Sequence, residues 1–268
     1  PEIDHGIVAC SVDEDGYAIM MRNVSQDLLP EDETLAETDN AFVLEALAAL
    51  HAAFWEDNRL YNQRLSLCKP EDFFAHTSVT RARRMAQKNP SFVLDLIIEG
   101  RRLIPKFVDT DMAELMYDLV HDPTSLCTAL ERYPQTLVHS DVRKANLGLE
   151  RGKRPRLIVL DWARQTRTVP AVDLIYYLIS ISWSRFPIPF EKNIDLYRQQ
   201  LAQRLGERFD ESWWQPQLEL SLLGTFSTMA CFMAWEAQHS DDASSREHNR
   251  ANLQWWAEQA RPGARWLA

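Results

Sequence analysis

Apolar residues recur at the three- and four-residue spacing of α-helices over most of this chain. The first such run follows Asp39, a residue type that caps helix N-termini, and includes Phe42, Leu47 and Leu50. Further helices are expected at about 77–88, 91–104, 109–121, 124–132, 172–183, 190–205, 211–239 and 244–260. Only 8 of the 268 residues are glycine, which leaves few of the tight turns that an all-β sandwich or barrel requires. The chain is therefore expected to form a mostly helical body.

Short β-segments interrupt this helical pattern at two places. At the N-terminus, residues 5–10 and 17–22 flank Asp15-Gly16, a dipeptide typical of hairpin turns. In the middle of the chain, strands are expected at 136–139, 146–150 and 157–160, the last two as a hairpin. Residues 26–38 are acidic and polar and are expected to form a linker. The predicted fold class is α+β, with a small central hairpin inside a helical body and two strands before it.

The charge balance argues against two classes of partner. With 29 Lys and Arg against 39 Asp and Glu, the formal net charge is −10. A protein this acidic has no overall electrostatic attraction to nucleic acid or to an anionic membrane. We therefore expect neither as a partner.

The cysteines and the hydropathy indicate a cytoplasmic protein. The four cysteines lie far apart in the sequence and are expected to be reduced thiols, and the histidines show no zinc-binding spacing. No signal peptide is evident, and no stretch reaches the ~18 apolar residues of a membrane span. The longest candidate, 174–183, is too short and contains serines.

One segment of the middle region carries the pattern of a phosphoryl-transfer site. Asp141 and Asn146 stand five residues apart in the segment 139–146, and Asp161 follows the predicted strand 157–160. If the loop wraps around one point, all three side chains face it. Asn146 and Asp161 supply the oxygen ligands that suit Mg²⁺, which takes the rest of its shell from water and phosphate. Asp141 is then available to accept a proton from a hydroxyl nucleophile.

These motifs resemble those of the aminoglycoside phosphotransferase and choline kinase branch of the protein-kinase-like fold. The resemblance lies in His139-x-Asp141 with Asn146, in Asp161-Trp162, and in Pro170 followed by Asp173-Leu174. The segment 47–51 (Leu-Ala-Ala-Leu-His) also resembles the family's L-x-x-L-H helix. In motif order the resemblance covers about residues 6–180. It implies a mostly helical C-terminal lobe with a small central hairpin, preceded by the last two strands of a nucleotide-binding lobe.

The resemblance also implies roles for individual residues. Asp141 would be the catalytic base, Asn146 and Asp161 the metal ligands, and His139 would orient the loop through hydrogen bonds to its backbone. Asp173, at a helix N-terminus, would hold the catalytic loop from behind. Arg143 would contact the γ-phosphate, although a solvated loop surface explains Arg143 and Lys144 equally well. Ser140 stands where this branch usually has glycine.

The segment 21–24 would be the hinge between the lobes, with the backbone of Arg22 and Val24 meeting the adenine edge. The family's phosphate-covering loop, its strand lysine and the paired glutamate should precede residue 5, and they are absent from this sequence. Residues 1–25 are accordingly interpreted as a remnant of the nucleotide lobe and hinge of a possible fragment, and 26–268 as the helical lobe with the catalytic loop and acceptor pocket.

The function implied is an ATP- and Mg²⁺-dependent phosphotransferase acting on a hydroxyl of a small molecule. One alternative is a non-catalytic interaction or regulatory module that keeps only this lobe, because the upstream half of the nucleotide site is missing. A second is a metal-dependent hydrolase that uses His139, Asp141 and Asp161. Neither the acceptor nor the oligomeric state can be deduced from the sequence.

Other prominent residues have structural explanations as well as functional ones. His51 is expected in the core or on a helix face rather than as a ligand. The tryptophan pairs 213–214 and 255–256 are expected mainly in the core. Acidic side chains late in the chain form either a solvated face or a site for a cationic aminosugar or choline-like head: Glu211, Glu219, Glu236, Asp241 and Asp242.

Overall fold

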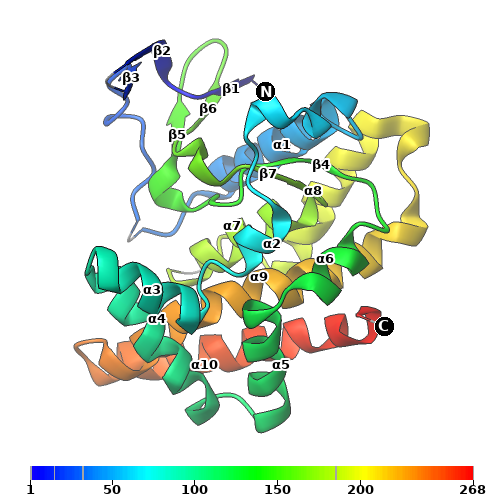
Figure 1. The fold of residues 1–268 in the computed structure, drawn as a ribbon. Coiled ribbons are helices and arrows are strands. Elements are labelled where there is room, and N and C mark those ends of the chain that lie inside the picture. Colours follow the sequence, from blue (N-terminus) through cyan, green and yellow to red (C-terminus); the bar gives the residue numbers. More distant parts are fainter. Residues whose placement is uncertain (1, 15, 32, 185, 268) are drawn as a thin grey trace.

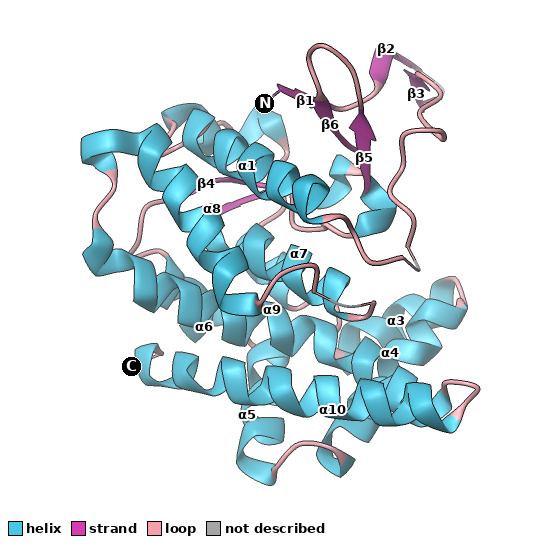
Figure 2. Ribbon diagram, turned by 180° about the vertical axis from the view of Figure 1, so that it is seen from behind, coloured by secondary structure: helices cyan, strands magenta, loops and turns pink. Residues whose placement is uncertain are grey.

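The computed structural model describes residues 2–14, 16–31, 33–184 and 186–267, and it places a helical body beside a small β region (Figures 1 and 2). The strands are β1 (Glu2–Asp4), β2 (Ile7–Asp13), β3 (Gly16–Met21), β4 (Thr136–Val138), β5 (Leu147–Glu150), β6 (Arg156–Val159) and β7 (Thr166–Thr168). The helices are α1 (Glu37–Ala53), α2 (Pro70–Phe74), α3 (Val79–Lys88), α4 (Phe92–Leu103), α5 (Thr110–His121), α6 (Thr124–Leu130), α7 (Ala171–Ser182), α8 (Phe190–Leu205), α9 (Glu211–His239) and α10 (Ala243–Ala260).

The strands form three small sheets. β2 and β3 make the antiparallel hairpin expected at the N-terminus, although Asp15 of its predicted turn lies outside the described residues. β5 and β6 form the central hairpin, and β1 adds to β6 in parallel as an unpredicted third strand. β4 pairs with β7 in antiparallel register. In both ribbon views, the first two sheets lie together at one end of the molecule (Figures 1 and 2).

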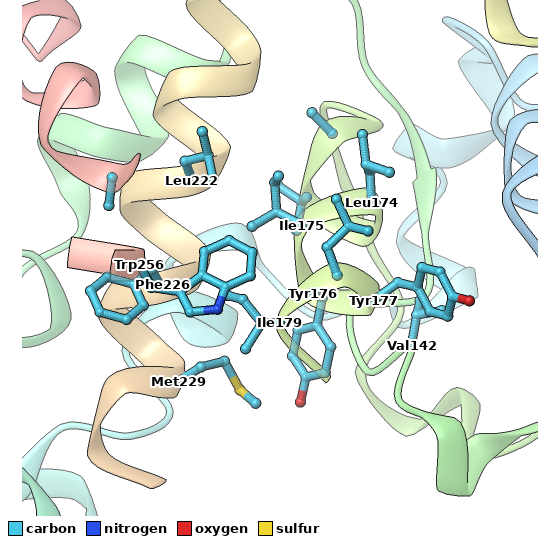
Figure 3. Close-up of a cluster of buried hydrophobic side chains, with 14 of the residues drawn as sticks. Val142, Leu174, Ile175, Tyr176, Tyr177, Ile179, Leu222, Phe226, Met229 and Trp256 are labelled. Atoms are coloured by element: carbon cyan, nitrogen blue, oxygen red, sulfur yellow. The ribbon is translucent and has the colours of Figure 1, made fainter. Parts of the chain in front are cut away.

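Helix α9 is the centre of the helical body, and α4, α7 and α10 pack along it. Every residue of α7 is buried, because this helix lies between α9 and the loop that contains Val142. Figure 3 shows Ile179 on the side of α7 that faces Phe226 and Trp256, with Tyr177 on the opposite side near Val142. The segment 139–146 is thus held against the core by a helix that has no solvent-exposed face.

Two expectations about membrane segments and caps need correction. The longest apolar helix is α9 rather than 174–183, and by length and composition α9 could cross a membrane. In the structure, 89% of its most apolar window is buried inside the protein, as in the core helix of a globular body.

Asp39 is not the N-cap of α1: the helix begins at Glu37 after Ala36. Asp39 lies in the first turn and binds Arg151 through two hydrogen bonds of 2.8 and 2.7 Å.

The C-terminal turn is anchored to α9 by one buried carboxylate. Glu219 accepts hydrogen bonds from Gln215 (2.8 Å), Arg265 (2.7 Å) and the Trp266 indole (2.6 Å). Glu219 is thereby fully engaged in structure. Glu211 forms an ion pair with Arg198 on the surface. The buried Glu219 is therefore not available to a cationic ligand.

Helices α4 and α9 approach closely at Gly100. A Cβ atom on Gly100 would lie 2.0 Å from the carbonyl oxygen of Cys231. We expect Gly100→Ala to lower the free energy of unfolding by about 3 kcal/mol, because the obstructing atom is backbone and cannot move aside cheaply. Chemical denaturation measures the change. Gly152→Ala is the matched control, since no atom lies within 4 Å of its added Cβ, and an equal loss in both variants would contradict this packing.

His76, in the turn between α2 and α3, makes stability depend on pH. Burial, followed by the nearby Arg164 charge, lowers the pKa of His76 from 6.5 to about 3. Below about pH 6.5, His76 is therefore protonated in the unfolded chain but stays neutral in the folded protein. We expect the free energy of unfolding to fall as the pH drops from 6.5 toward 3, by at most about 1.4 kcal/mol per pH unit.

Denaturation of a His76→Gln variant at a series of pH values checks this expectation. The variant should show a smaller acid-side slope than the parent protein, whereas His248→Gln, at an exposed position, should keep the parent slope. Identical slopes in the parent and in His76→Gln would rule out His76 as the cause.

Candidate active site

The segment 139–146 is held in place by the buried carboxylate of Asp173, near the start of α7. One carboxylate oxygen accepts the backbone N–H of His139 and the other accepts that of Ser140, both at 2.7 Å. Asp173 is fully buried, so these bonds replace the water that the charge would otherwise bind. The two amide groups at the start of the loop are therefore fixed relative to α7.

His51 of α1 supports Asp173 from the other side. Its Nε2 lies 3.1 Å from Asp173 Oδ2, and its Nδ1 lies 2.5 Å from the hydroxyl of Tyr197 on α8. A carboxylate only accepts hydrogen bonds, so Nε2 carries the proton that is donated to Asp173. Burial, followed by the Asp173 charge, raises the pKa of Tyr197, which keeps its hydroxyl as a donor to Nδ1. The prediction that His51 is a satisfied core residue is confirmed.

Both ring nitrogens of His139 are engaged within the loop. Nε2 donates to the carbonyl of Leu160 at 2.9 Å, and Nδ1 accepts from the backbone N–H of Asp141 at 3.3 Å. The edge-to-face contact with Trp162, at 4.7 Å between ring centres, fixes the ring further. His139 thus joins the segment 139–146 to the end of β6. Neither nitrogen has a lone pair free for a metal ion.

Asp141 is 7% exposed, and only one of its carboxylate oxygens has a protein donor. The hydroxyl of Tyr176 donates to Oδ1 at 2.7 Å. Burial of the Tyr176 side chain, followed by the Asp141 charge, raises the pKa of Tyr176, so this hydroxyl stays protonated. Arg143 Nε lies 3.7 Å from Oδ1, and this side chain is half exposed. In the described part of the chain, Oδ2 has no hydrogen-bond partner and is available to a substrate hydroxyl.

A backbone hydrogen bond between Leu160 and Asn146 brings Asp161, the next residue, close to Asn146. The Leu160 N–H donates to the Asn146 carbonyl at 2.8 Å, and Asn146 Nδ2 donates to the Asp141 carbonyl at 2.9 Å. This leaves the Asn146 amide oxygen as an acceptor, and the exposed Asp161 carboxylate has no protein partner among the described residues. These two unpaired oxygen atoms are suitable ligands for Mg²⁺.

The donor set is too small to hold a metal ion alone. Across the described ranges, no three His, Cys, Asp or Glu side chains gather in a way that could hold one. A Mg²⁺ ion bound between Asn146 and Asp161 would need further oxygens from water and from a phosphate-bearing substrate. The residues fit a metal that arrives with a nucleotide better than a resident structural ion.

The predicted hinge residues lie beside the β5–β6 hairpin. The Arg22 N–H donates to the Gly6 carbonyl and the Val24 carbonyl accepts from Asp27, at 2.8 and 2.9 Å. The Arg22 guanidinium contacts Asp4 (2.9 Å) and, more weakly, Glu150 (3.4 Å). These bonds use the Arg22 amide and the Val24 carbonyl, so only the Arg22 carbonyl and the Val24 amide remain for an adenine edge.

Two non-glycine residues at this site have left-handed backbone conformations. Ser140 has φ of 68° and Asp161 has φ of 61°, a region in which most L-residues are strained. The Ser140 hydroxyl is buried and has no hydrogen-bond partner in the described structure. The glycine usual in the resembling family at position 140 would carry neither cost, so the loop stores strain at this position.

One cavity adjoins the segment 139–146, and a second cavity shares the wall residue Trp183 with it. The first, of about 250 Å³, is lined by Arg143, Lys144 and Trp183. The second, of about 540 Å³, is lined by acidic and aromatic side chains, namely Trp183, Trp235, Glu236, Asp241 and Asp242, together with His239. Trp183, which directly follows α7, lies seven residues beyond Tyr176, or about 10 Å along the helix axis.

The structure also gives roles to residues that sequence reasoning missed. Tyr176 was not singled out, although it binds Asp141, because every residue of α7 is buried and its sequence has no polar face to mark one position. Lys144 is buried, and its Nζ donates to the Glu33 carbonyl (2.8 Å) and to Ser184 (3.1 Å), so it is not a solvated surface residue.

No protein-family model and no curated protein matches the chain. Among solved structures, choline kinase from Cryptosporidium parvum matches 94% of this chain and 72% of its own, with 13% identity and a TM-score of 0.50. Ethanolamine kinase from Plasmodium vivax matches 92% of this chain with 14% identity and a TM-score of 0.47. Aminoglycoside phosphotransferase from Alicyclobacillus acidocaldarius matches 98% of this chain and 73% of its own, with 15% identity and a TM-score of 0.41.

The choline kinase match establishes the fold. The chain has the α+β, protein-kinase-like fold that its motifs predict. It spans 65% of the length of the Plasmodium vivax ethanolamine kinase.

Replacing Ser140 should separate backbone strain from the buried hydroxyl. We expect Ser140→Gly to raise the free energy of unfolding by about 1 kcal/mol, because glycine adopts positive φ without steric cost. Ser140→Ala removes the unpartnered hydroxyl but keeps the strained backbone, and it should gain less. Chemical denaturation of both variants measures the difference. If alanine stabilises the protein as much as glycine, strain at this position is not the cause.

Proposed function

We propose that this protein is a phosphotransferase that moves the γ-phosphate of ATP, with Mg²⁺, onto the hydroxyl of a small amine-bearing alcohol. The observation that carries the proposal is the linked set of bonds from His139 to Leu160, from Leu160 to Asn146 and from Asn146 to Asp141. These bonds bring one buried carboxylate and two free oxygen donors to a single site. The fold supports the same class of reaction, since a solved structure with this fold is named as a choline kinase.

In this proposal, Asp141 orients the acceptor and takes its proton. Tyr176 occupies Oδ1, so the acceptor hydroxyl donates to Oδ2, and the proton moves there as the oxygen attacks phosphorus. Asn146 and Asp161 hold the metal, which when bound neutralises charge on the phosphoryl oxygens. Arg143 is half exposed beside Asp141 and can reach the same oxygens. The Arg22 carbonyl and the Val24 amide bind the adenine edge.

The larger cavity is the proposed acceptor pocket. Glu236, Asp241 and Asp242 supply negative charge, and Trp183 and Trp235 supply aromatic faces. A cationic amine is attracted by both, through ion pairing and through the quadrupole of the rings. Of the five late acidic residues, these three line the pocket, whereas Glu211 and Glu219 are not among its lining residues. This combination of charge and aromatic surface supports the proposed class of acceptor.

The hydrolase alternative has little support in this geometry. A zinc or manganese hydrolase would use His139, Asp141 and Asp161 as ligands, but both nitrogens of His139 are already hydrogen-bonded within the loop.

Two isosteric variants separate metal binding from proton transfer. We expect Asp161→Asn to abolish Mg²⁺-dependent ATP binding in calorimetry, because a neutral amide is a poor ligand for a hard cation. Asp141→Asn should retain ATP binding but slow phosphoryl transfer by about 10²- to 10⁴-fold. Transfer is measured as ADP release with a panel of amino alcohols, including choline, ethanolamine and an aminoglycoside.

Glu207→Gln, at an exposed carboxylate in the turn after α8, is the matched control and should change neither quantity. Failure of the parent protein to bind ATP with Mg²⁺, and to release ADP with any acceptor, would refute the proposal. That result would favour the non-catalytic module. ATP binding that Asp161→Asn leaves intact would instead show that the metal site is misplaced.

A further inference from the structure

Trp183, which directly follows α7, presents its ring to the outside of the helical body. The side chain is 43% exposed, and its helical backbone angles continue the direction of α7. The other tryptophans all pack against an aromatic ring or a cation. In the described part of the chain, the Trp183 ring has no such contact, and its indole N–H has no hydrogen-bond acceptor. Both the ring and the N–H are therefore open to a ligand.

Trp183 stands between two cavities of opposite charge. Among the described residues, it is the only one that lines both the cavity of about 250 Å³ and the cavity of about 540 Å³. The smaller, here called the basic cavity, has Arg143 and Lys144 on its lining, and the one acidic residue described there is the exposed Glu31. The larger, here called the acidic cavity, is lined by three carboxylates, those of Glu236, Asp241 and Asp242.

One face of α7 leads from Asp141 to the acidic cavity. Tyr176 binds Asp141 Oδ1 at 2.7 Å, and Ser180 lines the basic cavity. Tyr176, Ser180 and Trp183 follow one another at spacings of four and three residues, which places them on the same side of the helix. Since Trp183 lies about 10 Å from Tyr176 along the helix axis, a hydroxyl at Asp141 and an amine in the acidic cavity are separated by about the same distance.

The basic cavity disfavours an amine that lies close to the reacting hydroxyl. Arg143 lines this cavity, and its Nε lies only 3.7 Å from Asp141 Oδ1. An amine two carbons from a hydroxyl bound at Asp141 lies about 4 Å away from that hydroxyl, since an extended chain advances about 1.2 Å per bond. At that distance the charges of Arg143 and Lys144 repel an ammonium group, whereas the carboxylates beyond Trp183 attract it.

We propose that the acceptor is an extended amino alcohol, with its hydroxyl and its amine about 10 Å apart, and that Trp183 determines this specificity. The hydroxyl donates to Asp141 Oδ2, the apolar chain lies against the Trp183 ring, and the ammonium group enters the acidic cavity. This inference rests on the proposed phosphotransferase function and adds to it the length of the acceptor. A short amino alcohol cannot reach both ends.

Two isomers of one amino alcohol test the spacing. The oxygen and nitrogen are about 11 Å apart in extended 8-amino-1-octanol and about 4 Å apart in 2-amino-1-octanol. Both have a primary hydroxyl, one amine and the same number of carbons, so a general affinity for apolar chains does not separate them. We expect 8-amino-1-octanol to bind at least about tenfold more tightly in calorimetry, because its isomer loses either the hydrogen bond to Asp141 or the ion pair. The kcat/KM for ADP release should follow the same order.

Variants of the acidic cavity and of Trp183 test each part of the proposal. The double variant Glu236→Gln and Asp241→Asn should reduce the preference between the isomers to about threefold or less. Trp183→Ala should weaken the binding of 8-amino-1-octanol about three- to tenfold, and Trp183→Phe, which keeps an aromatic face, should restore most of it. Glu207→Gln, at an exposed position that lines neither cavity, is the control and should keep the parent preference.

The inference is overturned if the parent protein binds neither isomer, if it binds both equally, or if Trp183→Ala keeps the parent affinity for 8-amino-1-octanol. Its failure is distinct from that of the proposed function. A parent protein that releases ADP with both isomers at equal kcat/KM is a phosphotransferase without this specificity. One that prefers 8-amino-1-octanol in binding, but neither binds ATP with Mg²⁺ nor releases ADP, has the specificity and refutes only the proposed activity.

Discussion

The conformation of the segment 139–146 depends on one buried negative charge, the carboxylate of Asp173. It is inaccessible to water, and three donors from two different parts of the chain, the amides of His139 and Ser140 and the ring of His51, compensate it. Because His51 in turn contacts Tyr197, the same charge connects α1, α7 and α8 with the loop. A buried charge satisfied in this way fixes the direction of each partner, whereas apolar packing alone would let the loop slide against α7. The orientation of Asp141 toward its open side follows from this arrangement.

The sequence predicted the long helices and the order of the motifs well. The bounds of α8 and α9 agree with the helical spacing of their apolar residues, since long amphipathic or buried helices carry many turns of signal. The short elements β1, β7 and α2 were missed, because three to five residues are too few to establish a periodic pattern. Asp39 was expected to cap α1, but its ion pair with Arg151 depends on a hairpin more than 100 residues away.

The site was only partly predictable for a related reason. Motif spacing indicated Asp141, Asn146 and Asp161, and hydrogen bonds to backbone carbonyls hold these residues close together. Tyr176 carried no signal, because a tyrosine in a wholly buried helix is indistinguishable in sequence from a packing residue. The sequence could not show which of the late acidic residues line a cavity. Glu236, Asp241 and Asp242 lie near Trp183, whereas Glu219 binds the C-terminal turn, and this difference depends on how α9 and α10 pack in three dimensions.

The central position of α9 also determines how the protein unfolds. Since α2, α4, α5, α6, α7 and α10 all contact this one helix, none of them can separate without exposing part of its buried surface. The helical body is therefore expected to open as a single cooperative unit. The β2–β3 hairpin lies outside that unit, with Val8, Tyr17 and Ile19 largely exposed and few contacts to the body. Its amide hydrogens should exchange with solvent through local opening long before those of α9.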